Sequence, residues 1–105
     1  MSKISGRFTQ APEEKRRYIL NYTLTLSEGE TISNTVVNSI TQVFGLTTVA
    51  PFVIDNIVIG PGNTQVVFFA HGGDDQTDYE VQFLSTTSVG QIIEDVVYFS
   101  IQSDL

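Results

Sequence analysis

Apolar and polar residues alternate along much of this chain, and short clusters of turn-forming residues interrupt the alternation. From Tyr18 to Leu26 every second residue is a large apolar one, which is the period of a strand with one buried face. Residues 64–70 are apolar on both faces, which is typical of a central strand. No segment keeps the 3.6-residue period of an amphipathic helix. The pattern therefore predicts an all-β chain.

Clusters of Gly, Pro, Asn and Asp divide the chain into strands that lie roughly ten residues apart. The predicted strands cover residues 18–26, 31–40, 44–49, 52–59, 64–70, 78–85 and 91–100. About seven short strands joined by such turns predict an antiparallel β-sandwich, and a barrel is the alternative.

The charges are divided unevenly along the chain, whose net charge is −7. After Tyr18 there are ten acidic residues and no Lys or Arg. The five basic residues all lie within the first 17 positions: Lys3, Arg7, Lys15, Arg16 and Arg17. We therefore expect a basic, extended N-terminal arm of residues 1–17 and a sandwich domain of residues 18–105. Two interpretations of this arm stay open: it docks on the acidic surface of a neighbouring subunit, or it is a disordered solubilising tail.

Composition excludes several classes of function. The acidic body repels phosphates, so we expect no direct binding of nucleic acid. No stretch approaches the roughly 18 apolar residues of a membrane span, and the first residues lack the apolar run of a signal peptide, so we expect synthesis in the cytoplasm and no membrane contact. The absence of Cys excludes disulfides and thiolate metal sites.

Candidate chemistry is sparse. His71 is the only histidine, no nucleophile-elbow motif accompanies it, and zinc would need more ligands of its kind. The acids of residues 94–95 are adjacent, so a regular strand points them to opposite faces. Three acids between residues 74 and 78 fit turn chemistry, with Ca²⁺ binding as the alternative, although their spacing differs from that of an EF-hand loop. We therefore predict no enzyme and no cofactor.

Two blocks of sequence resemble one family. The first is Tyr22–Ser33, a strand followed by a turn in which Gly precedes an acid, Thr and Ile. The second begins with the apolar strand of residues 66–69, which leads to Gly72-Gly73, the turn at residues 86–90 and a last strand with acids at residues 94–95. Over residues 18–101 this arrangement is similar to that of the phage fibre–tail adaptor family.

The resemblance implies an immunoglobulin-like sandwich in the virion of a bacteriophage. It implies a structural protein at the tail, the neck or the fibre attachment that links tail to fibres, or head to tail, as a homo-oligomer in a symmetric ring. The implied partners are other virion proteins such as tail tube, connector or fibre, and the particle assembles in the host cytoplasm. A carbohydrate-binding or capsid-decoration module is the alternative, which an exposed aromatic patch from Tyr79, Phe83 or Tyr98 would support.

The interface residues follow from charge. We expect the basic residues of the arm to meet acids of a neighbouring subunit, and the acidic loop to offer such a surface. The candidate interface residues are Lys15, Arg16, Arg17, Asp74, Asp75 and Asp78.

Overall fold

The computed structural model describes residues 4–46 and 50–103, and within them the chain forms strands joined by turns. In chain order the elements are β1 (Ile4–Gln10), β2 (Lys15–Asn21), β3 (Ile32–Phe44), β4 (Phe52–Ile59), the 3-10 turn η1 (Pro61–Asn63), β5 (Gln65–Gly72), β6 (Thr77–Thr87) and β7 (Ile92–Ile101). In this part of the chain no helix is long and apolar enough to cross a membrane.

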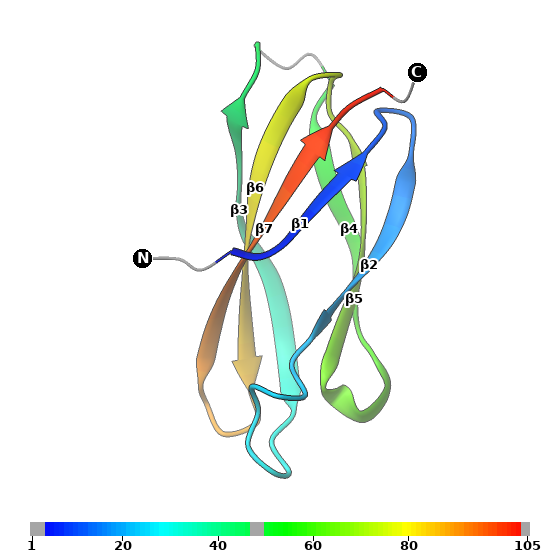
Figure 1. The fold of residues 1–105 in the computed structure, drawn as a ribbon. Coiled ribbons are helices and arrows are strands. Elements are labelled where there is room, and N and C mark those ends of the chain that lie inside the picture. The colour runs from blue at the N-terminus through cyan, green and yellow to red at the C-terminus, as the bar shows by residue number, and fades with distance from the viewer. Residues whose placement is uncertain (1–3, 47–49, 104–105) are drawn as a thin grey trace.

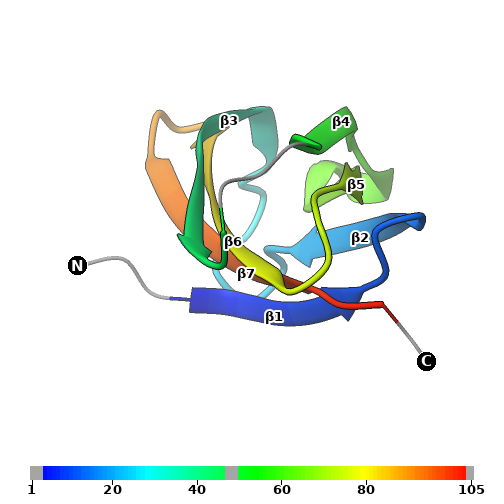
Figure 2. The ribbon, with the colours of Figure 1, turned by 90° about the horizontal axis from the view of Figure 1, so that it is seen from above.

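The strands form two sheets that pack face to face (Figure 1). The four-stranded sheet has the order β1-β7-β6-β3, and the three-stranded sheet has the order β2-β5-β4. β1 runs parallel to β7, and all other paired neighbours are antiparallel. Seen from above, β1 and β2 lie along the same side of the two layers (Figure 2). The predicted sandwich of about seven strands is confirmed, while its immunoglobulin-like character stays a prediction.

An aromatic cluster occupies the space between the sheets. Phe99 lies at its centre, with its ring centroid 5.0 Å from that of Phe52 and 5.2 Å from that of Tyr18. Phe68 of β5 meets Phe83 of β6 at 4.8 Å across the two layers. Burial alternates strictly along β6, as expected for a strand with one face on a core. Burying such side chains is the main favourable contribution to folding.

Several strands agree closely with the sequence pattern. β4 covers the predicted residues 52–59, and β5 is the central strand of its sheet, as its two apolar faces indicated. The strand predicted for residues 18–26 ends earlier, at Asn21, because the Asn21 side chain accepts the backbone N–H of Thr23 at 3.0 Å and turns the chain. The strand predicted for residues 44–49 is corrected as well: Phe44 ends β3, and residues 47–49 lie outside the described residues.

The largest correction concerns the predicted arm of residues 1–17. Residues 4–10 form β1 beside the last strand, and residues 15–17 open β2. The side chain of Phe8 packs against Tyr18, with ring centroids 4.6 Å apart, which joins the two strands across the side of the sandwich. Residues 4–17 therefore belong to the sandwich rather than to an extended arm, and residues 1–3 lie outside the described residues.

Candidate interaction surface

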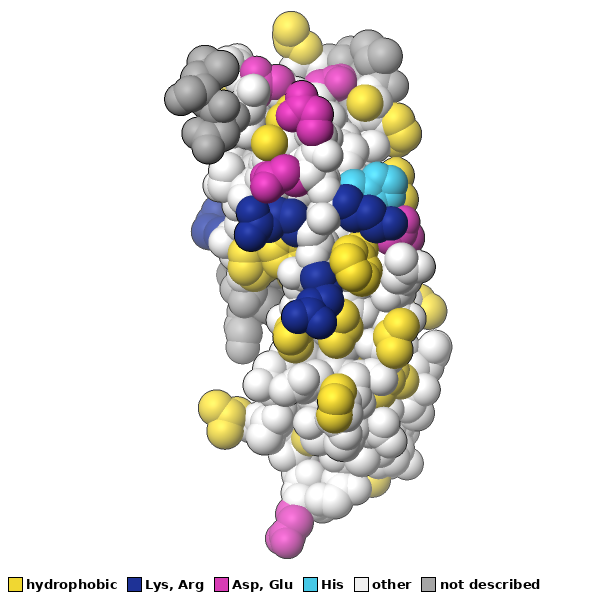
Figure 3. All heavy atoms as spheres, turned by 90° about the vertical axis from the view of Figure 1, so that its right-hand side faces the viewer, with side chains coloured by type: hydrophobic (Ala, Val, Ile, Leu, Met, Phe, Trp, Pro, Cys, Tyr) yellow, Lys and Arg dark blue, Asp and Glu magenta, His cyan; other side chains and the backbone are white. Residues whose placement is uncertain are grey.

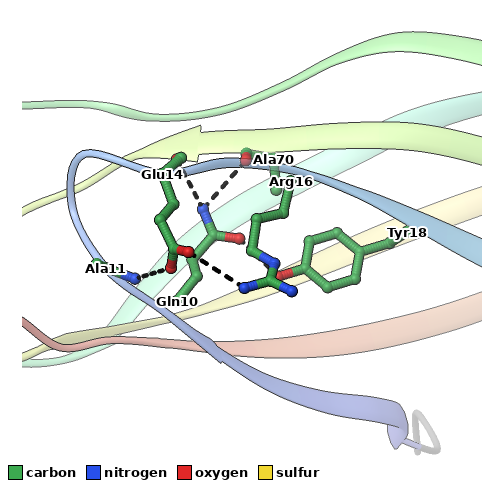
Figure 4. A network of polar contacts seen from close by, with 6 residues as sticks. All are labelled: Gln10, Ala11, Glu14, Arg16, Tyr18 and Ala70. Carbon is green, nitrogen blue, oxygen red and sulfur yellow. Dashed lines mark hydrogen bonds and ion pairs between the residues drawn. The ribbon is translucent and has the colours of Figure 1, made fainter. Parts of the chain in front are cut away.

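The buried side chain of Gln10 stabilises the corner between β1 and β2 through hydrogen bonds (Figure 4). Gln10 is 2% exposed, and its Nε2 donates to the carbonyl oxygens of Ala70 at 3.1 Å and Glu14 at 3.2 Å. Its Oε1 accepts the hydroxyl of Tyr18 at 2.6 Å. All the polar atoms of this side chain are thus satisfied, as burial requires. The corner therefore fixes the start of β2, which carries the basic residues Lys15, Arg16 and Arg17.

Glu14 completes the corner from the outside. Its Oε1 accepts a hydrogen bond from the backbone N–H of Ala11 at 2.7 Å, and its Oε2 forms an ion pair with Nη1 of Arg16 at 3.1 Å. The backbone hydrogen bond from Ala11 and, to a smaller extent, the charge of Arg16 hold the pKa of Glu14 below its usual value. Arg16 is therefore engaged within its own chain.

Lys15 contributes to a second charged group on the outward face of the three-stranded sheet. Its Nζ lies 3.5 Å from Oδ2 of Asp55, and the same oxygen lies 3.0 Å from Nε2 of His71. The cross-strand register explains this group, because Lys15 pairs with His71 on β5, and Asp55, which pairs with Phe69 on β5, is the diagonal neighbour of His71 on the same face. Sequence reasoning missed Asp55, which carries no motif and reaches this group only through strand pairing.

Arg17 differs from its neighbours. It is exposed on β2, and among the described residues no acidic side chain or aromatic ring engages its guanidinium. Arg7, by contrast, lies over the ring of Tyr98 at 4.9 Å. Arg17 thus presents an uncompensated positive charge, and a strongly hydrogen-bonding planar group, to solvent.

Apolar side chains surround this charge. Ile19, Val67 and Val58 form one row across β2, β5 and β4, and Arg17 pairs with Phe69 in the next row. A bulge at Asn56, whose φ is 52°, places Val58 on the same face as Asp55. Ile19 is 48% exposed and Val58 is 58% exposed. We call this outward surface the basic face; its members are Lys15, Arg17, Ile19, Val53, Asp55, Val58, Val67, Phe69 and His71.

Figure 3 shows this side of the molecule in space-filling form. The Lys and Arg side chains gather in a band across it, and hydrophobic side chains lie between and below them. Acidic side chains lie mainly toward the upper end, and also beside the histidine and at the lower tip. An apolar surface rimmed by charge is the usual composition of a protein docking site.

The carboxylates of the acidic loop, Asp74, Asp75 and Asp78, bond to other parts of their own chain. Oδ1 of Asp75 accepts the backbone N–H of Ser103 at 2.7 Å, and Oδ1 of Asp74 accepts that of Ala50 at 3.4 Å. Oδ2 of Asp78 accepts the hydroxyl of Tyr98 at 2.7 Å. Each of these bonds joins the aspartate to a residue at least 20 positions away, so they link the loop to other parts of the chain and differ from the local contacts of turn-forming aspartates. Among residues 4–46 and 50–103, no three acidic or histidine side chains come together as a metal site would require.

The outward side of the four-stranded sheet has the opposite charge. Cross-strand pairing places Asp78 beside Ser100, Glu80 beside Tyr98, and Leu84 between Glu94 and Val36. We call this surface the acidic face; its members are Arg7, Val36, Thr41, Asp78, Glu80, Gln82, Leu84, Ile92, Glu94 and Tyr98. The hydrogen bond to Asp78 raises the pKa of Tyr98 above its usual value.

The geometry offers little to catalysis. His71 and Asp55 form a pair of the kind found in hydrolytic triads, yet no hydroxyl of the described residues hydrogen-bonds to the imidazole. What the surface offers is two broad faces of opposite charge on one rigid sandwich.

Comparison with known protein families matches residues 10–100 to the family described as podophage GP4 fiber-tail adaptor protein gp77. The chain belongs to this family. A search of curated proteins finds no relative. The match runs from Gln10 at the corner to Ser100 in the last strand, so it spans both sheets.

Membership of the fibre–tail adaptor family confirms the family predicted from the two sequence blocks. It gives the chain a structural role associated with the phage tail, as part of the virion and in contact with other virion proteins. The roles of Lys15, Arg16, Arg17 and the acidic loop as interface residues stay predictions.

Proposed function

We propose that this protein links tail to fibres as one copy in a symmetric homo-oligomeric ring, and that the basic face is its docking surface. The observation that carries the proposal is Arg17, which has no acidic partner among residues 4–46 and 50–103 and lies among exposed apolar side chains, on a chain whose net charge is −7. Protein interfaces have an apolar core in which Arg is enriched, so an exposed Arg surrounded by apolar side chains is typical of a docking surface.

In this proposal the docking surface is the basic face of the folded sandwich, in place of the extended arm expected from the sequence. Lys15 and Arg16 have acidic partners in their own chain, so Arg17 supplies the charge of the basic face that has no acidic partner among the described residues. Lys15 lies beside it on the same face, and Arg16 lies outside that face. Exposed ion pairs of this kind contribute only about 0–1 kcal/mol and exchange readily for a partner's acid. We also propose that the protein joins the particle in the host cytoplasm, before the particle is complete.

The alternative as a carbohydrate-binding or decoration module gains no support from the aromatic residues. It depended on an exposed patch from Tyr79, Phe83 or Tyr98. Tyr79 is 4% exposed and Phe83 is fully buried, while Tyr98 is held by Asp78 and Arg7.

Complementation of a phage that lacks this gene tests the proposal. The variants are Arg17→Gln and Ile19→Asn, with Gln91→Glu and Leu24→Asn as matched controls. Gln91→Glu makes the same change in net charge at an exposed hairpin, and Leu24, which is 101% exposed, lies in the loop after β2. We expect the two basic-face variants to give particles with fewer fibres in electron micrographs, and the controls to give full complements.

Two results would count against the proposal. Full fibre occupancy for both basic-face variants would show that this face is not used. Heads without tails, in place of tailed particles without fibres, would move the site of action to the head–tail junction. Thermal melting of each variant separates loss of docking from loss of folding.

A further inference from the structure

Two uncompensated charges of opposite sign lie on opposite faces of the sandwich. Arg17 is exposed on the basic face, and Glu80 lies on the acidic face beside Tyr98 and Thr41. No hydrogen bond or ion pair within the described residues engages the Glu80 carboxylate. The other described Lys and Arg residues have partners in their own chain.

Apolar side chains accompany each of these charges. The basic face carries the row of Ile19, Val67 and Val58. The acidic face carries Leu84 beside Val36, which is 46% exposed, and Ile92, which is 69% exposed. Each face thus combines an apolar area with one dominant sign of charge, and the two signs are complementary.

We propose that the basic face of one copy packs on the acidic face of the next copy, with Arg17 of one copy paired with Glu80 of the other. This inference rests on the proposed function, because it takes the basic face to be a docking surface, and it names a second copy of the chain as the occupant.

Symmetry favours this head-to-tail arrangement over a two-fold dimer. A two-fold contact through the basic face would bring the positive bands of both copies together, and like charges at an interface are unfavourable. A contact between two different faces pairs opposite charges at every interface, and it closes into a ring when the rotation between copies permits.

The size of the face sets the strength of one contact. Three strands about 4.8 Å apart and about 3.3 Å long per residue give a β2-length face of on the order of 300 Å². A stable pair of proteins buries about 800 Å² per partner. A single contact is therefore weak, and closure of the ring, which gives every copy two contacts, stabilises the assembly. The purified chain in dilute solution is then mostly monomeric.

Intermolecular paramagnetic relaxation detects so weak a contact. The chain has no Cys, so Asn34→Cys provides one attachment point for a nitroxide, at an exposed position of the edge strand β3 beside the acidic face and outside its members. The labelled protein is mixed with ¹⁵N-labelled protein that carries no nitroxide. We expect selective broadening of amide signals around residues 17–19 and 67–69, on the basic face of the ¹⁵N-labelled partner.

Charge reversal makes the test specific. Arg17→Glu in the ¹⁵N-labelled partner should remove the broadening, and Glu80→Arg in the nitroxide-labelled protein should restore it. A nitroxide at Thr25→Cys, in the exposed loop after β2, is the control for random encounters. Amide spectra of each variant verify folding.

The outcomes separate this inference from the proposed function. Broadening on the partner's acidic face would demonstrate a two-fold contact and overturn the head-to-tail pairing, as would broadening no greater than that from the control label. If fibre attachment still depends on Arg17 in either of those cases, the basic face docks another virion protein and the proposed function stands without this contact.

Discussion

Replacing Gln10 by Met tests whether the corner between β1 and β2 is built into the fold. Met has nearly the same length and shape but forms none of the three hydrogen bonds of the amide. The substitution leaves the carbonyl oxygens of Ala70 and Glu14 and the hydroxyl of Tyr18 without this partner, and Ala70 is fully buried.

The magnitude follows from these contacts. An intramolecular hydrogen bond contributes about 0.5–1.5 kcal/mol net, and a buried group left unsatisfied costs about 1–3 kcal/mol. One buried and two partly buried bonds together give a loss of about 2–4 kcal/mol in the free energy of unfolding. Because domains are stable by only about 5–15 kcal/mol, this is a large fraction. In a domain of this size it lowers Tm by about 8–30 °C.

Urea unfolding followed by circular dichroism measures the loss. Hydrogen exchange shows where it falls: amides of β1 and of the start of β2 should exchange faster, and those of β5 and β6 should change little. Gln102→Met is the matched control, because Gln102 is exposed and, within the part of the chain that the structure describes, its side chain bonds only to Ser100 at 3.1 Å. A cost below about 0.5 kcal/mol for Gln10→Met, equal to that of a surface change, would refute the reasoning. It would show that the Gln10 side chain does not hold residues 4–14 firmly to the sandwich.

Three further changes test other parts of the fold. Ser85→Ala should cost about 1–3 kcal/mol in urea unfolding, because the hydroxyls of Tyr22 and Thr35 lose their buried partner, whereas exposed Ser39→Ala should cost under about 0.5 kcal/mol. Gly90→Ala, with φ at +88° in open space, should cost about 1–2 kcal/mol, and Gly72→Ala should cost more, since its Cβ would lie 2.2 Å from the Pro51 carbonyl oxygen; equal melting temperatures would contradict this. The pKa of Glu14 is lowered by folding, so its stabilisation is complete above about pH 4.5 and is lost as the pH falls through the lower folded value; Glu14→Gln should therefore flatten the acid side of a pH–stability curve, and an unchanged curve would show that this carboxylate does not contribute.

The sequence predicted the strands whose apolar pattern matches their burial. Residues 52–59 and the hairpin of β6 and β7 are bounded by Pro and Gly turns, and side chains alternate strictly along β6, so local pattern and tertiary structure agree there. The strand beginning at Tyr18 was extended too far, because alternation continues to Leu26 although Leu24 is fully exposed. Alternation alone does not report which residues find a partner strand.

The first strand was missed for the opposite reason. Its inward positions include Gly6 and Gln10 along with Phe8, so the run lacks the apolar signal of a strand although Gln10 is deeply buried. The basic residues of the candidate surface stand out in the sequence, but Asp55, the acidic partner of Lys15, lies 40 positions away from it. Strand register brings Asp55 beside Lys15 and His71, and register is a property of the folded chain.

The parallel pairing of the first and last strands has a mechanical consequence. A pull on the Ile4 end of β1 and the Ile101 end of β7 acts in opposite directions along two strands that run the same way. The ladder from Ile4 with Val96 to Gln10 with Ile101 is then loaded in shear, so its hydrogen bonds bear the force together instead of opening one after another. Tension applied at those two ends is therefore resisted by the whole ladder between β1 and β7 at once.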